Sequence, residues 1–304
     1  MSGAAPVPQA AAAASPLKGI ALLVAAMFSL TLLDATAKYL SQFYPVLLVT
    51  WARYFFNVLI LLVWLGPSLG RRLIATRRPR LQLARGVVLA VSSILFFFSL
   101  SLLPLAEATA ITYVTPVLIT LVSVHVFRER PPHGTWLALA VSFAGVLLIV
   151  RPGSGVFSWP ALLPLLTAFG FAAYQLMTSR LAGVDDRMAT LFIGALVGTA
   201  VLSVAAPFVW TWQIDPMHAA LLVALGGIAA FAHWLIISAY EHAQASTLAP
   251  FVYSQVIATL SLGWLVFGDF PDRWSIAGMA LITGTGVALA LRNRPRPVLS
   301  APRR

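Results

Sequence analysis

The chain has no cysteine in its 304 residues, only nine acidic residues, and charged side chains at 10% of its positions. Without cysteine there is no disulfide and no thiolate metal site, and the sequence leaves the redox compartment open. The HExxH, Walker A and DDxxD patterns are missing too. We therefore expect no metal and no cofactor, and driving energy has to come from gradients rather than from ATP bound by this chain.

Three short motifs resemble functional signatures but lack the context those signatures need. The segment 66–70 spells GxSxG, but it ends an apolar run and no strand precedes it, unlike a nucleophile elbow. Gly284 and Gly286 lie inside another apolar run, where a dinucleotide loop does not fit. Gly194 and Gly198 form GxxxG, which is typical of close helix packing in membranes. None of these motifs indicates an enzyme, and we expect the chain not to be one.

Apolar residues dominate, with 60% hydrophobic positions and a mean hydropathy of +0.90, as in a chain dissolved mainly in lipid. About 20 helical residues cross a hydrocarbon core of about 30 Å. The apolar runs have about this length and lack the alternation of barrel strands. We predict an all-α integral membrane protein with ten transmembrane helices, at approximately 17–40, 45–66, 82–103, 106–127, 134–151, 159–181, 187–209, 218–240, 244–267 and 274–291.

One unit occurs twice in the chain. Residues 103–131, LPLAEATAITYVTPVLITLVSVHVFRERP, return in altered form as residues 242–271, HAQASTLAPFVYSQVIATLSLGWLVFGDFP. The C-terminal ends of the two segments align when the residue numbers differ by 140, but their polar beginnings align at a difference of 137. Between the polar beginning and the C-terminal end, the two copies of the repeat therefore differ by three residues in length. We predict a disordered tail, two five-helix repeats and a basic cytoplasmic tail, at 1–16, 17–151, 159–291 and 292–304.

Basic residues predict the orientation. If the N-terminus is cytoplasmic, sixteen of the 20 Lys and Arg residues, Arg85 among them, flank the cytoplasmic helix ends. Both termini are then cytoplasmic. Contact with anionic lipid explains the net charge of +11, and we expect the lipid bilayer rather than nucleic acid as a partner. Monomer and homodimer both remain open.

The odd number of helices in each repeat makes the second repeat enter the membrane from the opposite face. Inverted repeats around a midplane site are typical of secondary transporters, because exchanging the conformations of the halves opens the site to either side. We expect the first, third, fourth, sixth, eighth and ninth helices to enclose one such site.

A set of residues spread along the chain forms a pattern, namely Lys38, Arg53-Tyr54, Pro116, Glu129, Gly145, Gly268-Asp269 and Gly286. In this order they resemble the paired EamA domains of the drug/metabolite transporter superfamily. Val256 and Asp269 depart from the pattern, which often has Pro and Glu there. The resemblance covers roughly residues 17–291.

The resemblance implies export or exchange of small metabolites across the bacterial inner membrane, with neutral or aromatic amino acids as the leading substrate class. Drugs or organic cations, and other metabolites such as S-adenosylmethionine or nucleotide-type molecules, are alternatives in the same fold. A membrane-embedded lipid-modifying enzyme is a more distant one, because it needs paired carboxylates or a metal cluster at one depth.

Asp34 is a carboxylate inside the first helix, where charge is expensive unless it faces protein or water. Lys38 follows one turn later, on the same face as Thr31 and Asp34. Arg53 lies at a similar depth in the second helix. We expect an ion cluster of Asp34, Lys38 and Arg53, which either joins the two helices or handles substrate and protons.

Polar stripes predict cavity-lining faces on two further helices, although such stripes also serve close packing. Pro116 and Pro250 are expected to bend these helices and act as hinges, with the shallower bend at Pro250. The predicted cavity residues on these two helices are Thr109, Thr112, Tyr113, Tyr253 and Ser254.

Tyr174, Gln175, Thr178 and His233 complete a set of amphipathic groups at mid-span. Aromatic walls with a few polar tips suit a zwitterion with an apolar side chain, or an organic cation. A lone histidine in a membrane helix is more often an interhelical hydrogen-bond partner than a proton relay. Both roles are possible for His233 from the sequence.

Overall fold

The computed structural model describes residues 16–102, 105–131, 133–150, 160, 162–211, 213–267 and 273–292. These residues are helical apart from short connections. The elements are α1 Pro16–Leu40, α2 Val46–Leu69, η1 Gly70–Ile74, α3 Pro79–Leu102, α4 Leu105–Thr112, α5 Thr115–His125, α6 Thr135–Val150, α7 Leu162–Leu181, α8 Arg187–Ser203, η3 Ala206–Phe208, α9 Pro216–His242, α10 Ala245–Leu248, η4 Ala249–Tyr253, α11 Ser254–Phe267 and α12 Arg273–Arg292. Nearly all of both predicted tails, and the Gly268-Asp269 motif, lie outside the described residues.

Each of the ten predicted apolar segments contains a helix of the described chain. Five stretches, α1, α2 with η1, α3, α7 and α9, are long and apolar enough to cross a bilayer by length and composition. Two predicted helices are interrupted, and the segment predicted to end at 209 stops being α-helical at Ser203. An all-helical membrane fold is therefore present, and the count of ten crossings stays a prediction.

Local capping explains where two of the helices begin. The Asp186 carboxylate accepts hydrogen bonds from the backbone N–H groups of Met188 and Ala189 at the start of α8. Asp215 accepts one from Met217 at the start of α9, where Pro216 is the first helical residue. Such caps satisfy backbone donors that a first helical turn leaves free.

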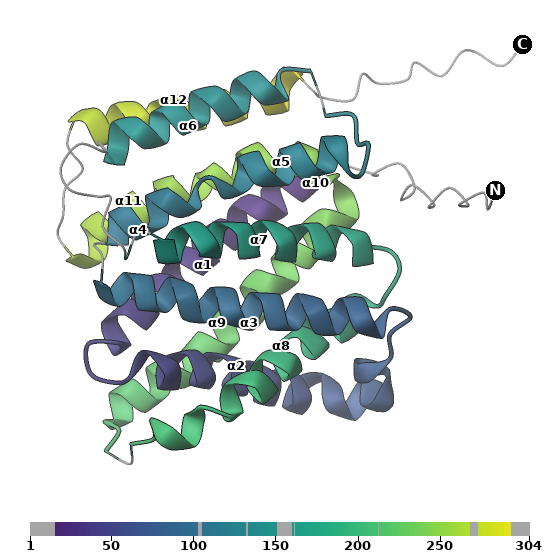
Figure 1. The fold of residues 1–304 in the computed structure, drawn as a ribbon, viewed down its shortest axis with the longest axis vertical. Coiled ribbons are helices and arrows are strands. Elements are labelled where there is room, and N and C mark those ends of the chain that lie inside the picture. The colour runs from purple at the N-terminus through teal and green to yellow at the C-terminus, as the bar shows by residue number, and fades with distance from the viewer. Residues whose placement is uncertain are drawn as a thin grey trace, which may run out of the picture.

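The two halves of the chain pack with equivalent partners. If α1, α2, α3, α4–α5 and α6 correspond in order to α7, α8, α9, α10–α11 and α12, the contact of α1 with α9 matches that of α7 with α3. The contact of α2 with α9 then matches that of α8 with α3, and α1 with α11 matches α7 with α5. The α2–α8 and α6–α12 pairs map onto themselves and lie at opposite ends of the stack in Figure 1.

Glycines let α8 approach its neighbours closely. A Cβ atom on Gly198 would lie 2.2 Å from Cδ1 of Tyr54 on α2, and one on Gly194 would lie 3.0 Å from a guanidinium nitrogen of Arg85 on α3. A contact of 2.2 Å is impossible without movement of the tyrosine. The GxxxG motif therefore serves packing within the chain, as its pattern indicated.

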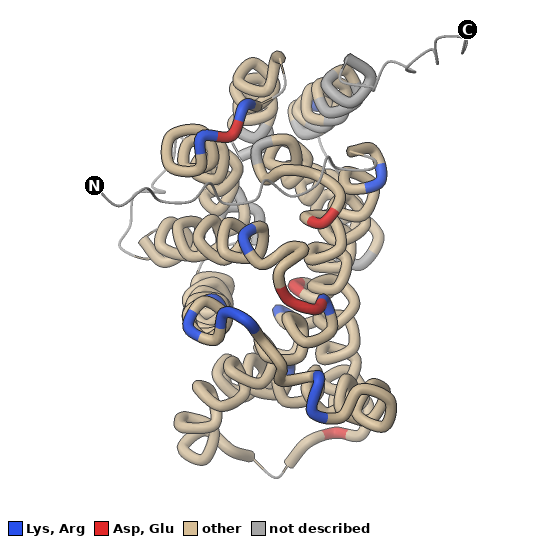
Figure 2. The backbone as a smooth tube through the Cα atoms, turned by 90° about the vertical axis from the view of Figure 1, so that its right-hand side faces the viewer, with Lys and Arg blue, Asp and Glu red and all other residues tan. Residues whose placement is uncertain are grey.

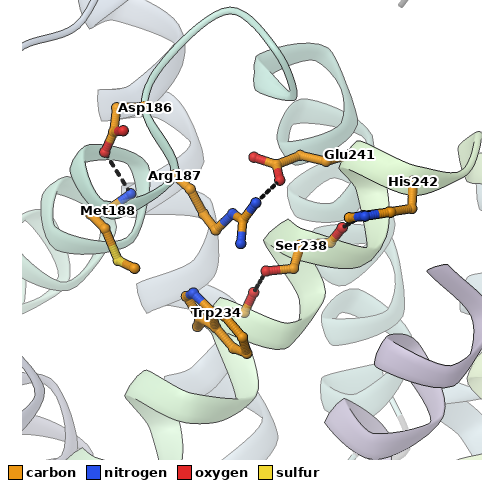
Figure 3. Close-up of polar contacts among 7 residues, drawn as sticks. All are labelled: Asp186, Arg187, Met188, Trp234, Ser238, Glu241 and His242. Carbon is orange, nitrogen blue, oxygen red and sulfur yellow. Dashed lines mark hydrogen bonds and ion pairs between the residues drawn. The ribbon is translucent and has the colours of Figure 1, made fainter. Parts of the chain in front are cut away.

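Many of the charged residues lie along the chain at one end of the helices, which faces the viewer in Figure 2. Arg187 forms an ion pair with Glu241 in the last turn of α9, and its guanidinium lies 5.8 Å from the Trp234 ring centre (Figure 3). At this end Asp185 accepts hydrogen bonds from Thr76, from Arg77 N at 2.8 Å and from Gln82 at 3.0 Å.

Burial on its own would raise the pKa of the Asp185 carboxyl, but these three hydrogen bonds and the positive charge of Arg77 outweigh it and hold the pKa below the ordinary value of 3.8. Asp185 thereby joins the loop after α7 to the segment before α3, across the two halves. The cytoplasmic location of this end stays a prediction.

Candidate substrate cavity

Two helix interruptions place polar groups in the centre of the protein. Between α4 and α5, Tyr113 and Val114 form a turn immediately before the first turn of α5, which contains Pro116. Between α10 and α11, residues Ala249–Tyr253 form a 3-10 segment with Pro250 at its start. Proline fits these positions because first-turn N–H groups have no helical partner. Their role as hinges stays a prediction.

The second interruption is longer than the first, and the shallower bend that the sequence predicted there stays a prediction. Pro250 opens a full 3-10 segment instead of bending a continuous helix. The rings of Tyr113 and Tyr253, one at each interruption and 140 positions apart, pack with their centres 6.0 Å from each other.

A cavity of about 70 Å³ lies between the two halves. All six helices expected to enclose the site contribute to its wall, and α2 adds Arg53. Five aromatic rings stand beside a few polar groups. The lining residues are Met27, Leu30, Asp34, Arg53, Leu89, Ser93, Phe96, Phe97, Thr112, Tyr113, Thr115, Phe171, Tyr174, Gln175, His233, Ile236, Val252 and Gln255.

A chain of hydrogen bonds runs along one side of this cavity. The Arg53 guanidinium bonds to Ser93 Oγ at 3.1 Å and to His233 Nε2 at 3.0 Å. His233 Nδ1 lies 3.0 Å from Tyr174 Oη, which in turn receives a hydrogen bond of 2.9 Å from Arg85. Arg53, Arg85, Tyr174 and His233 are all buried, so the network is held in a low-dielectric interior.

Arg85 anchors the far end of this network. Its Nε donates to Thr178 Oγ1 at 2.8 Å, and a terminal nitrogen donates to the Thr190 carbonyl at 3.1 Å. Its guanidinium carbon lies 4.7 Å from the centre of the Tyr174 ring. Only 2% of Arg85 is exposed, so this side chain does not serve as a contact for anionic lipid; its place at the cytoplasmic flank stays a prediction.

Asp34 faces the cavity from α1. Its carboxylate accepts one long hydrogen bond, 3.3 Å, from Gln255 Nε2 on α11. Among the described residues it forms no ion pair within 4.0 Å, so the predicted Asp34–Lys38–Arg53 cluster is not formed. The reason lies in Arg53, whose two terminal nitrogens are directed at Ser93 and His233 instead.

The family follows from comparison with known proteins. The model of the EamA-like transporter family matches residues 17–151 and again residues 158–292. The chain belongs to the EamA-like transporter family. It is 24% identical over 268 residues to the S-adenosylmethionine uptake transporter of Rickettsia prowazekii, and the alignment covers 88% of this chain and 90% of the relative.

Other relatives of this EamA-like chain are named for different substrates. The riboflavin transporter of Vibrio cholerae is 28% identical, covering 88% of this chain and 91% of its own. The pseudopaline exporter CntI of Pseudomonas aeruginosa is 27% identical, covering 90% and 95%. A solved crystal structure superposes with a TM-score of 0.73 at 21% identity, over 92% of this chain and 98% of that one. The last likeness shows the fold alone.

Seven of the residues selected from the sequence line the cavity of this EamA-like protein, namely Asp34, Arg53, Thr112, Tyr113, Tyr174, Gln175 and His233. The other selected residues are not part of the lining. Thr31 donates to the Met27 carbonyl, and Thr178 accepts from Arg85. The remaining selected residues outside the lining are Lys38, Thr109, Pro116, Pro250, Tyr253 and Ser254. A role in substrate binding stays a prediction for all of them.

Sequence reasoning missed the polar face of α3. Gln82, Arg85 and Ser93 are buried, and Ser93 reaches the cavity. Their spacing of three and then eight residues places them close to one face of a helix, inside a segment that otherwise looked uniformly apolar. That spacing could have identified the polar face from the sequence. Nothing in the sequence marked Phe96, Phe97 and Phe171 as cavity residues, because aromatic residues are common in every apolar segment.

Proposed function

We propose that this protein is a secondary transporter that exports or exchanges small zwitterionic metabolites, with neutral or aromatic amino acids first, across the bacterial inner membrane. The observation that carries the proposal is the central cavity, whose wall combines aromatic rings with Asp34 from one helix and Arg53 from another. Aromatic walls accept an apolar side chain, and two opposite charges accept an amino and a carboxylate group.

Alternating access explains how such a cavity is loaded. At about 70 Å³ it is smaller than the roughly 300–1,000 Å³ of typical small-molecule sites. Loading therefore requires the halves to separate on one side. The interruptions at Tyr113 and at Ala249–Tyr253 supply backbone that is able to bend beside the cavity. Equivalent packing of the two halves supports exchange of their conformations.

An S-adenosylmethionine-like substrate is the second candidate. The Rickettsia relative is named for uptake of S-adenosylmethionine, a molecule that itself carries an α-amino carboxylate. The buried Arg53 disfavours simple organic cations because it places a like charge in the cavity wall. A lipid-modifying enzyme is disfavoured because, among the described residues, Asp34 is the one carboxylate in the lining and no metal-binding cluster occurs.

Counterflow in proteoliposomes tests the proposal. Vesicles loaded with unlabelled amino acid should accumulate the labelled form transiently, faster than protein-free vesicles do. A parallel series loaded with S-adenosylmethionine distinguishes the two candidates, and a pH gradient shows whether protons contribute. If neither substrate class gives counterflow above protein-free vesicles, the proposed function is wrong.

A further inference from the structure

We propose that Arg53 and Tyr174 form a carboxylate-binding site, so that an anionic group is what the cavity requires of its substrate. The inference rests on the proposed function of the cavity and defines its substrate class further. From the sequence, Arg53 was expected to belong to an ion cluster with Asp34 and Lys38 that either joins two helices or handles substrate and protons. The hydrogen bonds around His233 give it a different role.

The partners of His233 fix its tautomer. An arginine guanidinium only donates hydrogen bonds, so His233 Nε2 must accept the bond of 3.0 Å from Arg53. A neutral imidazole has one N–H, which then resides on Nδ1 and donates to Tyr174 Oη at 3.0 Å. A protonated His233 would direct an N–H at the Arg53 donor. His233 is thus a neutral positioning residue rather than a proton relay.

The Tyr174 hydroxyl oxygen consequently accepts two hydrogen bonds. Its oxygen receives one hydrogen bond from Arg85 at 2.9 Å and one from His233. Among the residues that the structure describes, both of its hydrogen-bond partners are donors, so its own phenolic hydrogen is unused. Tyr174 lines the cavity and is 3% exposed. A buried O–H donor is therefore available to an acceptor that enters the cavity.

Arg53 also retains unused donor capacity. Its Nε has no hydrogen-bond partner among the described residues, although the side chain is only 5% exposed and lines the cavity. Ser93 cannot take more, because it donates to the Leu89 carbonyl and accepts from Arg53 and Tyr54. No carboxylate of the described chain lies within 4.0 Å of Arg53. A buried charge is normally paired, and a substrate carboxylate supplies the missing partner.

Charge balance favours an anion for the same reason. Arg53 and Arg85 carry two positive charges in this network, His233 is neutral, and Asp34 is the single carboxyl group among the lining residues that the structure describes. Arg85 holds Tyr174 in place but does not line the cavity, so it acts as a positioning residue. A carboxylate that accepts from Arg53 and from the Tyr174 phenol would satisfy both free donors.

Three probes of one shape test the site in the full-length protein in detergent. L-phenylalanine carries both charges, L-phenylalaninamide lacks the carboxylate, and 3-phenylpropionate lacks the amine. Titration calorimetry should show binding of both carboxylates, and binding of the amide at least about tenfold weaker than that of phenylalanine. If neither carboxylate binds the parent protein, the inference is wrong.

Variants separate binding from folding. Arg53→Gln and Tyr174→Phe should each weaken carboxylate binding about ten- to hundredfold and leave binding of the amide nearly unchanged. Tyr54→Phe is the matched control, because Tyr54 is also 3% exposed and bonds to Ser93 but does not line the cavity. It should retain the parental preference for carboxylates. Tyr174→Phe keeps the test valid if Arg53→Gln does not fold.

Two results distinguish this inference from the proposed function. If phenylalanine and its amide bind equally, and Tyr174→Phe changes both alike, the carboxylate site is wrong while amino-acid transport stands. If 3-phenylpropionate binds in an Arg53-dependent manner but amino acids show no counterflow, the carboxylate site holds and the amino-acid proposal is wrong.

Discussion

Replacement of Asp34 by asparagine should impair transport much more than folding. The carboxylate has one hydrogen bond, 3.3 Å long, and no ion-pair partner within 4.0 Å among the described residues. Asparagine has nearly the same shape and still accepts from Gln255. The change therefore leaves no buried cation of the described chain without its partner, which is the usual source of large losses when a buried pair is broken.

The expected magnitudes differ for the two properties. Loss of charge from one long hydrogen bond costs about 1 kcal/mol or less, whereas breaking a buried ion pair costs about 3–5 kcal/mol. About 1 kcal/mol corresponds to a shift in Tm of roughly 2–4 °C in a chain of a few hundred residues. If Asp34 binds the substrate ammonium group, loss of a charge-assisted hydrogen bond reduces transport about ten- to hundredfold.

Thermal unfolding in detergent and counterflow in proteoliposomes measure the two effects on the same preparations. Glu241→Gln is the matched acid-to-amide control, because it breaks the ion pair with Arg187 outside the cavity. That variant should lose stability and keep its transport rate per folded molecule. The reasoning is refuted if Asp34→Asn lowers Tm by about 10 °C or more while the surviving protein transports at the parental rate.

Three further predictions concern packing, pH and the hinge. Gly198→Ala should destabilise the protein by about 1–3 kcal/mol in thermal unfolding, because its Cβ would lie 2.2 Å from Tyr54, whereas Gly284→Ala, with nothing within 4 Å, should be nearly neutral. The depressed pKa of Asp185 contributes stability that is present above the unfolded-state pKa and is lost as pH falls through the folded-state pKa. The drop in Tm below about pH 4 should thus be smaller in Asp185→Asn, and an unchanged drop would contradict this sign. Pro116→Ala should preserve expression and slow exchange; parental exchange rates would make Pro116 a packing residue only.

The helical fold was predictable from the sequence because the periodicity and length of apolar segments report directly on the lipid environment. The two interruptions were predictable in position from Pro116 and Pro250, but not in form. A proline in the sequence indicates that the regular helical hydrogen bonding is interrupted. The surrounding packing determines the form of the interruption, which is a two-residue turn near Pro116 and the 3-10 segment Ala249–Tyr253 at Pro250.

The sequence predicted several residues of the candidate site, but it did not predict the hydrogen bonds between them. Asp34, Tyr174 and His233 stood out because polar groups are rare in apolar segments, and all three line the cavity. The partners of Arg53 were beyond prediction, since depth along two helices does not specify which way a long side chain turns. The lipid contact expected for Arg85 is absent, because an arginine near a helix end resembles a lipid anchor until its burial is known.

The self-matching contacts of α2 with α8 and of α6 with α12 bear on how the molecule is assembled. Each is a contact between corresponding helices of the two halves, the arrangement that two identical subunits make across a symmetry axis. Either half alone exposes both of these faces and contains only part of the cavity wall, with Arg53 in one half and Tyr174 and His233 in the other. Neither half alone therefore contains the complete proposed carboxylate site. Because the two halves are joined in one polypeptide, every molecule contains both parts of the cavity wall.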